Sequence, residues 1–309
     1  MGEMTEYGAM FRNAAFRKCA LNLSDRGGAN RLLGKINWSP LIYGLMTALS
    51  FAIAFPFLWM LMNSLKTKDE IWALPPRLFP VAPQWQNYAD ALSDGMFFRY
   101  MWNSVYTSIC ITLFTLLNSA MFAYAITHIR FYGRNILFIV VMITYIMPPA
   151  STYVPSYILL AKLGLINSPT GYMLSCAANI LNIFFFRQTF LQINRSVLEA
   201  ARIDGAGHHG ILWRIIVPMS GSAFAAMGVL DFIMNYNSYM WPSLILKRKA
   251  HYLVSMGLRS FFSSGGAYGM KWGAIMAACC VVVIPLLLIF ALGGRWVIKT
   301  ITHDSSVKE

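Results

Sequence analysis

The sequence predicts an all-α membrane protein with six transmembrane helices, and two observations support this fold class. Of the 309 residues, 57% are hydrophobic and only 12% are charged, whereas soluble domains carry about 25% charged residues. The apolar residues also gather in long runs that contain almost no charge. Each run exceeds the ~20 residues that a helix needs to cross about 30 Å of hydrocarbon.

The apolar runs give the expected transmembrane elements in chain order. Asp231 interrupts the fifth run, and prolines lie within the third, fifth and sixth. A proline inside a membrane helix frees a carbonyl that a neighbouring helix or water must satisfy, which is compatible with a bundle lining a pathway. The predicted spans are Leu41–Leu65, Tyr100–Thr127, Asn135–Ala161, Leu163–Phe186, Ile215–Leu246 and Trp272–Gly294.

The loops between these runs predict the orientation. With both termini in the cytosol, 15 of the 25 Lys and Arg residues lie in cytosolic segments, and an excess of basic residues marks the cytosolic side. We therefore expect an N-in, C-in, multi-pass membrane protein. Its parts are a cytosolic arm at residues 1–40, a transmembrane domain at 41–301 and a cytosolic tail at 302–309.

Composition and motifs exclude several other classes. The net charge of +13 is spread over loops between spans, so we expect no nucleic-acid partner. Five cysteines, most of them inside apolar runs, give no disulfide or zinc framework. The sequence lacks a G-x-x-x-x-G-K-[ST] phosphate loop, paired carboxylates and a nucleophile motif. We therefore expect no catalytic residue, metal or cofactor in this chain, which cannot hydrolyse ATP alone.

The loop between spans four and five, Leu198–Pro218, has the most informative pattern. Glu199 to Ile203 favours a helix, and Asp204-Gly205 is a turn dipeptide whose glycine can adopt positive φ. An apolar face then leads into the next span. Two short helices at an angle would form a knob on the cytosolic face. His208 and His209 are too close in sequence to share one helix face, so surface contact is favoured over metal binding there.

This loop resembles the EAA loop of ABC importer permeases, written E-A-A-x3-G-x9-I-x-L-P, with Val217 in the place of the leucine. In that family the loop docks into a cleft on a separate ATP-hydrolysing subunit. The resemblance implies that the ATPase-docking residues of this chain are Glu199, Ala200, Ala201, Asp204, Gly205, Ala206, Ile215 and Pro218.

The resemblance extends from about Ile42 to Ile301. Over this range the sequence is similar to the maltose-type branch of carbohydrate importers, for example in the fragments PFLWMLMNSLKT, FAYAITHIRFYGR and YNSYMWP. It departs from that pattern at Ser238, where the family often has an acidic residue. The resemblance implies one half of a permease that moves a carbohydrate into the cytosol by alternating access. The implied partners are a second, homologous permease subunit, two ATPase subunits that hold ATP and magnesium, and an extracytoplasmic solute-binding protein.

Span five supplies the candidate translocation path. A carboxylate within a membrane helix costs roughly 2.5–3.5 kcal/mol on insertion scales, so Asp231 is expected to face the bundle interior or water. Amides and aromatic rings follow it, and both suit a carbohydrate. Asp231 could equally belong to an interhelical hydrogen-bond network that touches no solute, and both interpretations stay open. The path residues are Asp231, Asn235, Tyr236, Asn237, Tyr239 and Trp241.

Two further alternatives remain. An ion-coupled secondary transporter needs ionisable groups within its spans, and only Asp231 qualifies. The loop Lys247–Lys271 carries five basic residues and no acidic one. It is compatible with a solvated loop, with contact to a periplasmic binding protein, or with an acidic polysaccharide substrate of the kind that the alginate importer carries.

Overall fold

The computed structural model describes residues 39–93, 95–263 and 271–303, and this part of the chain is helical without a strand. The predicted arm at residues 1–40 lies almost wholly outside the described residues, as do residues 304–309 of the predicted tail. The chain divides into two compact units, Met1–Trp59 (unit 1) and Met60–Glu309 (unit 2). The division falls within helix α3, Ser39–Ser64.

Helix α3 coincides with the first predicted span. It has 26 residues and contains Pro56. The most apolar 18-residue stretch of this helix has a mean hydropathy of 2.0, and none of its residues is buried. A helix that is hydrophobic all round fits a lipid environment, because no face of it is suited to water.

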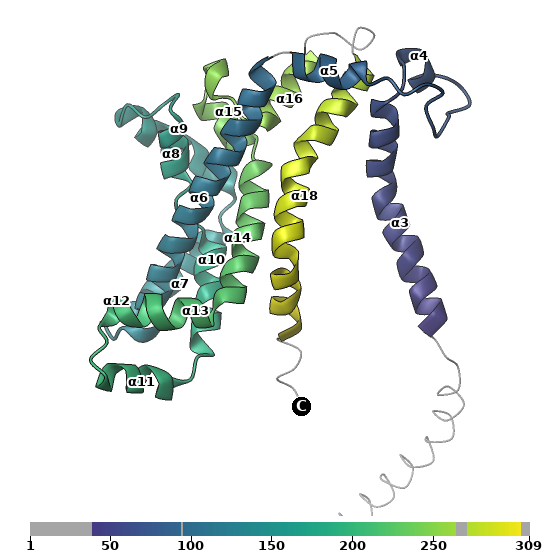
Figure 1. Cartoon of the computed structure of the whole chain (residues 1–309). Coiled ribbons are helices and arrows are strands. Elements are labelled where there is room, and N and C mark those ends of the chain that lie inside the picture. The colour runs from purple at the N-terminus through teal and green to yellow at the C-terminus, as the bar shows by residue number, and fades with distance from the viewer. Residues whose placement is uncertain (1–38, 94, 264–270, 304–309) are drawn as a thin grey trace, which may run out of the picture. The chain divides into compact units, whose positions relative to one another are not determined.

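Unit 2 is a bundle built on two long helices, α6 (Gly95–His128) and α18 (Trp272–His303). Helix α14 (Gly221–Tyr236) packs against both of them, and α10 (Ile180–Leu191) packs against α6. Figure 1 shows these helices side by side along the bundle. Within the described residues, α3, α6 and α18 are long and apolar enough to cross a membrane. The prediction of long apolar helices is thus confirmed for these elements, and all three are candidate membrane spans.

The third predicted span, Asn135–Ala161, is not one straight helix. It consists of α7 (Arg134–Ile146) and α8 (Pro149–Lys162), which meet at an angle of 105°. The break lies at Pro148-Pro149, where two rings exclude the preceding residue from helical geometry and remove two N–H donors. Met147 is accordingly extended, with ψ 131°.

The fourth and fifth predicted spans are interrupted as well. Helix α9 (Pro169–Ser175) ends before α10, which at 12 residues is too short to cross a bilayer alone. In the fifth run, the helical stretch His208–Met219 meets α14 at 80°. Ile215 therefore belongs to the preceding segment, and the fifth run turns into the bundle only at Gly221. Counting each bent pair as one span gives up to five candidate spans in the described part of the chain.

The two ends of unit 2 carry the short elements. At one end lie α11 (Arg195–Ile203), α12 (His208–Gly210), the π-helix η1 (Ile211–Ile216) and α13 (Val217–Met219); we call Arg195–Met219 the elbow. The opposite end of the bundle carries α4 (Lys68–Ile71), α5 (Gln86–Ser93), α15 (Met240–Ile245), η2 (Lys249–His251) and α16 (Val254–Ser263).

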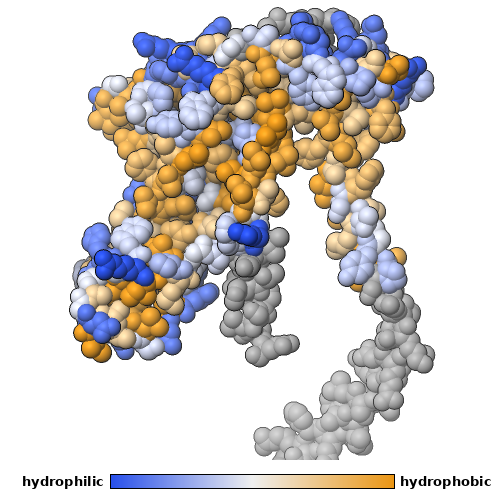
Figure 2. Space-filling model, viewed as in Figure 1, coloured by the Kyte–Doolittle hydropathy of each residue, from blue (hydrophilic) through white to orange (hydrophobic). Residues whose placement is uncertain are grey.

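Hydropathy follows the same division. Figure 2 shows hydrophobic surface along the middle of the bundle and hydrophilic residues gathered at its two ends. This distribution is what a bilayer requires of a spanning bundle, because polar groups in hydrocarbon are costly unless they are hydrogen-bonded. The elbow and the α15–α16 region therefore lie at opposite polar ends.

Candidate functional site

The elbow begins with a helix that is capped at both ends. The Asn194 side chain accepts a hydrogen bond from the Ser196 N–H (3.1 Å) and starts α11. At the other end Gly205 has φ +82°, its N–H donates to the Arg202 carbonyl (3.0 Å), and the Ala206 N–H donates to the Ala201 carbonyl (2.9 Å). This pair of bonds is a Schellman motif, which favours glycine at the left-handed position. The turn predicted at Asp204-Gly205 is present.

The inner face of α11 is packed into the bundle. Leu198 and Ala201 are buried in one apolar cluster with residues of α6, α10, η1 and α14. Within this cluster the Phe186 ring of α10 stacks on Phe224 of α14, with centroids 4.2 Å apart. Leu198 and Ala201 therefore belong to one close-packed cluster with residues of α6, α10 and α14, and such clusters deform little.

The outer face of α11 is exposed and presents both charge and apolar surface. Glu199, Ala200 and Asp204 are exposed, and Ile203 has 86% of its surface accessible. The sequence interpretation missed Ile203. It follows Leu198 by five positions, about 140° around a helix, so an apolar residue facing away from the buried side was visible in the helical period.

The remaining docking candidates differ in how far they are buried. Gly205 and Pro218 are exposed, whereas Ala206 and Ile215 are half-buried against the apolar cluster beneath the elbow. Ala201 is buried in the same cluster. The motif residues therefore include both a surface that another protein can touch and the packing that holds this surface in place.

His208 links the elbow to α6. Its Nδ1 lies 2.8 Å from the Tyr124 hydroxyl, and the two rings meet edge to face with centroids 5.9 Å apart. The His128 ring lies 5.5 Å from the same tyrosine. His209 is exposed. The sequence interpretation placed both histidines at the surface. The structure shows in addition that His208 connects the elbow to α6 through Tyr124.

Asp231 lies at the centre of a hydrogen-bond network and is 2% exposed. Its carboxylate accepts from the Thr115 hydroxyl of α6 (2.8 Å), from the Asn179 amide that precedes α10 (2.7 Å), and from the Asn182 amide of α10. The Asn235 amide donates to the Asp231 carbonyl (2.8 Å). One carboxylate thus joins α14 to α6 and to the break between α9 and α10.

The aromatic candidates of the path point to different places. Tyr236 is fully buried and donates to the Val282 carbonyl of α18 (3.0 Å). Trp241 donates its indole N–H to the Ser175 hydroxyl (2.9 Å) and stacks on Tyr153 with centroids 5.2 Å apart. Asn237 is exposed and Tyr239 is half-buried. The structure brings Asp231 and Asn235 together, places Tyr239 and Trp241 in one apolar cluster, and leaves Tyr236 in another.

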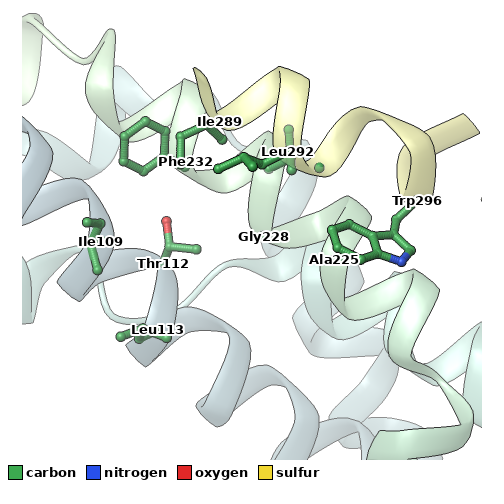
Figure 3. Close-up of a pocket in the computed structure, with 11 residues that line it drawn as sticks. Ile109, Thr112, Leu113, Ala225, Gly228, Phe232, Ile289, Leu292 and Trp296 are labelled. Atoms are coloured by element: carbon green, nitrogen blue, oxygen red, sulfur yellow. The ribbon is translucent and has the colours of Figure 1, made fainter. Parts of the chain in front are cut away.

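An apolar hollow of about 300 Å³ lies among α6, α14 and α18. Figure 3 shows Ile109 and Leu113 of α6 facing Ile289 and Leu292 of α18 across it, with Gly228 of α14 at its wall. A saccharide in this hollow would lose the hydrogen bonds that its hydroxyls make with water, which is costly without replacement. The apolar hollow is therefore unsuited to a polar solute.

Comparison with known families decides the class of the protein. Residues 37–303 match the family described as the binding-protein-dependent transport system inner membrane component. The chain belongs to this family. It is a transport permease of the inner membrane, as predicted, and the ion-coupled secondary transporter is not supported.

Individual relatives of the permease are similar over most of their length. The arabinooligosaccharides transport permease AraQ of Bacillus subtilis is 31% identical over 257 residues, which cover 82% of this chain and 90% of the relative. The sn-glycerol-3-phosphate transport permease UgpE of Yersinia enterocolitica is 32% identical over 253 residues, covering 80% and 90%.

A solved structure shares the fold. The crystal structure of a bacterial ABC transporter involved in the import of the acidic polysaccharide alginate contains a chain that matches with a TM-score of 0.74. The match covers 86% of the permease and 97% of that chain, at 21% identity. A second alginate transporter structure, in complex with an alginate pentasaccharide-bound periplasmic protein, matches with a TM-score of 0.62.

At the end of the bundle opposite the elbow, the segment 66–84 of the permease, which contains Pro75, Pro76, Pro80 and Pro83, is fixed by buried and charged groups. Lys66 is 1% exposed and donates to the Asn63 side chain (2.8 Å) and the Arg77 carbonyl (2.6 Å), and burial lowers the pKa of its amine. The Glu70 carboxylate accepts from the backbone N–H groups of Thr67 and Val81, both at 3.0 Å. These two bonds hold the pKa of Glu70 below its ordinary value.

Proposed function

We propose that this permease is one half of the membrane part of an ATP-driven importer that moves a carbohydrate into the cytosol by alternating access. The observation that carries the proposal is the elbow. Its exposed outer face presents Glu199, Ile203 and Asp204, and its buried inner face packs onto α6, α10 and α14. A surface that is open outward and rigidly backed is suited to receive a movement from another protein.

The proposed docking of an ATPase requires the elbow to lie in the cytosol, and this sets the orientation of the spans. We assign six spans: α3, α6, α7 with α8, α9 with α10, α14 with α15, and α18. Both termini then lie in the cytosol with the elbow, which agrees with the basic residues of the cytosolic segments. The cytosolic arm at 1–40, the permease domain at 41–301 and the tail at 302–309 belong to the same assignment.

The proposed partners supply what this chain lacks. Two ATPase subunits bind ATP and magnesium, and one of them docks on the elbow through Glu199, Ala200, Asp204, Gly205 and Pro218, with Ala201, Ala206 and Ile215 as their packing support. A homologous permease subunit completes the pathway, and an extracytoplasmic solute-binding protein delivers the substrate. ATP shifts the bundle between its two states only to the extent that the docked ATPases bind those states with different affinities.

The carbohydrate substrate is supported by two comparisons, because one relative is named for arabinooligosaccharides and one structural neighbour for alginate. The path assignment remains Asp231, Asn235, Tyr236, Asn237, Tyr239 and Trp241. For Asp231 the geometry favours the network interpretation, since the carboxylate accepts hydrogen bonds from three protein groups. A carboxylate so occupied positions the helices around a path better than it binds a solute.

The test is recovery of the assembly from its native membrane. The tagged full-length chain is purified in mild detergent, and bound subunits are identified by mass spectrometry. We expect a second permease and an ATPase. Glu199→Lys should lose the ATPase and keep the second permease, because it reverses a charge on the outer face of α11. Gln192→Lys, which adds the same charge at an exposed position before α11, should keep both.

Two results would overturn the proposal. One is recovery of the chain without any ATPase. The other is an ATPase that stays bound to Glu199→Lys as tightly as to the unchanged protein, since the elbow would then not be its docking surface.

A further inference from the structure

A second hollow, of about 520 Å³, lies at the end of the bundle opposite the elbow. Its volume is within the range of about 300–1,000 Å³ that small-molecule sites occupy. It is formed between α15, η2 and α16. We call it the basic hollow; its lining residues are Tyr239, Ser243, Lys249, Tyr252, Met256, Arg259 and Ser260.

The lining combines aromatic rings, positive charge and hydroxyl groups. Lys249 and Arg259 are exposed, and their charges meet no acidic neighbour in sequence, because the chain has no Asp or Glu between Asp231 and Asp304. The Arg259 guanidinium donates to the Tyr239 hydroxyl and lies 5.4 Å from the centroid of the Tyr239 ring. The Tyr252 ring supplies a second aromatic face.

Side-chain amides hold the backbone of this hollow in place. The Asn103 amide of α6 donates to the carbonyls of Ala250 (2.9 Å) and Tyr252 (3.1 Å). The Asn167 side-chain oxygen accepts from the N–H groups of Lys247 (3.0 Å) and Arg248 (2.9 Å). The segment that carries Lys249 and Tyr252 is therefore fixed on both sides, and a preorganised site loses less conformational entropy when a ligand binds.

Helix α16, which carries Arg259, is fixed against α6 as well. The Ser104 hydroxyl accepts from the Val254 N–H (2.8 Å) at the start of α16. A Cβ at Gly257 would lie 2.4 Å from Cδ2 of the Tyr100 ring, so glycine allows the two helices to approach closely. The spacing of the cations and rings in the basic hollow thus depends on fixed elements.

We propose that the basic hollow binds a carboxylated saccharide, an inference that rests on the proposed function as a carbohydrate importer. Tyr239 and Tyr252 contact the C–H faces of the sugar, and Lys249 and Arg259 pair with its carboxylate. The serine hydroxyls of the lining donate to and accept from sugar hydroxyls. Guanidinium groups bind carboxylates through parallel hydrogen bonds, and these are stronger than bonds between neutral groups.

The combination of groups discriminates between ligand classes. A neutral sugar would use the rings and hydroxyls of the lining but would make no ion pair with Lys249 or Arg259. A small inorganic anion would use the cations but leave the rings unused. Since guanidinium binds phosphate as well as carboxylate, a phosphorylated polyol is the competing ligand, and the test must separate the two.

The test measures equilibrium binding to the purified full-length assembly in lipid nanodiscs, without the solute-binding protein. The probes are trigalacturonate, maltotriose as a neutral sugar of the same length, and sn-glycerol 3-phosphate. We expect trigalacturonate to bind at least about tenfold more tightly than either other probe. Tenfold corresponds to the lower end of the free energies that hydrogen bonds to charged groups contribute. Its affinity should fall as salt is raised.

Variants then locate the site. The double variant Lys249→Gln with Arg259→Gln should reduce trigalacturonate affinity about tenfold or more and leave maltotriose affinity unchanged. Arg248→Gln is the matched control, because Arg248 is an exposed cation next to Lys249 that does not line the hollow. It should leave both affinities unchanged. Elution as a single complex in size-exclusion chromatography verifies folding of each variant.

Three outcomes would overturn the inference. They are equal affinity for trigalacturonate and maltotriose, tighter binding of sn-glycerol 3-phosphate, and an equal loss in Arg248→Gln and the double variant. None of these outcomes would change the expected co-purification of an ATPase through the elbow. Loss of that co-purification would instead contradict the proposed function itself.

Discussion

Both ends of the bundle rest on apolar clusters, but they differ in the contacts that fix their exposed segments. At the elbow, Leu198 and Ala201 anchor α11 through apolar packing, and the exposed Ile203 adds apolar surface. At the opposite end, Asn103 and Asn167 hold the basic hollow through hydrogen bonds to backbone groups. Apolar packing transmits displacement, whereas hydrogen bonds fix the direction of polar groups. The comparison separates an end that we propose is moved by an ATPase from an end that we propose recognises the solute.

The largest expected effect lies between these ends, at Asp231. Asp231→Ala removes the acceptor of the Asn179 and Asn182 amides, and each unsatisfied buried donor costs about 1–3 kcal/mol. We expect the free energy of unfolding to fall by about 3 kcal/mol, measured by thermal unfolding in detergent. Asn235→Ala, which removes one bond to the Asp231 carbonyl, should cost about 1 kcal/mol. A variant Asp231→Ala that is as stable as the unchanged protein yet transports nothing would assign Asp231 to the solute instead.

An effect of similar size concerns apolar packing beneath the elbow. Leu198→Ala leaves a cavity in a cluster where Leu198 is 4% exposed, and such truncations cost about 2–5 kcal/mol. Hydrogen exchange should become much faster throughout α11. Val197→Ala on the same helix, at 39% exposure, should change exchange little. Equal protection in both variants would show that packing does not hold the elbow.

A smaller effect is expected where the elbow turns. Gly205→Val places a branched side chain at φ +82°, which costs about 1–2 kcal/mol, and should reduce substrate uptake by the reconstituted importer about tenfold. Gly207→Val is the matched control, because Gly207 has φ -73°. Comparable uptake by the two variants would mean that the shape of the turn is unimportant for coupling.

The smallest effect is a pH dependence confined to the end opposite the elbow. Because the pKa of Glu70 is lowered in the folded protein, its bonds to Thr67 and Val81 contribute stability that is complete above the ordinary Glu pKa. This contribution is lost as the pH falls through the lower folded value. Protection factors at these two amides, corrected for intrinsic exchange, should drop in acid. Glu70→Gln should remove that dependence, and a dependence that persists in it would contradict this account.

The sequence predicted features that depend on neighbours along the chain. Long apolar runs predicted α3, α6 and α18, and Asp204-Gly205 predicted the turn that caps α11. These signals are local, because span length and backbone conformation depend on composition and on glycine. Pro148-Pro149 was also visible, but the 105° bend that it produces depends on how α8 packs.

Contacts between distant residues could not be predicted in this way. The Asp231 carboxylate meets Thr115, which lies 116 positions away, and Asn103 reaches a carbonyl 147 positions away. A single sequence gives no signal for such pairs, because any polar residue in an apolar run requires a partner without specifying which one. The burial of the docking candidates could not be predicted either, since Ala200 is exposed whereas its neighbour Ala201 is buried.

The most direct test of the coupling role is photocrosslinking from the outer face of α11. A photoreactive amino acid at position 203 replaces Ile203, and one at position 85 replaces the exposed Trp85 at the opposite end of the bundle. In the assembled importer, position 203 should crosslink to an ATP-hydrolysing subunit with a yield that changes on ATP binding, and position 85 should not. A crosslink from position 203 only to lipid, or to an extracytoplasmic protein, would contradict the coupling role of the elbow.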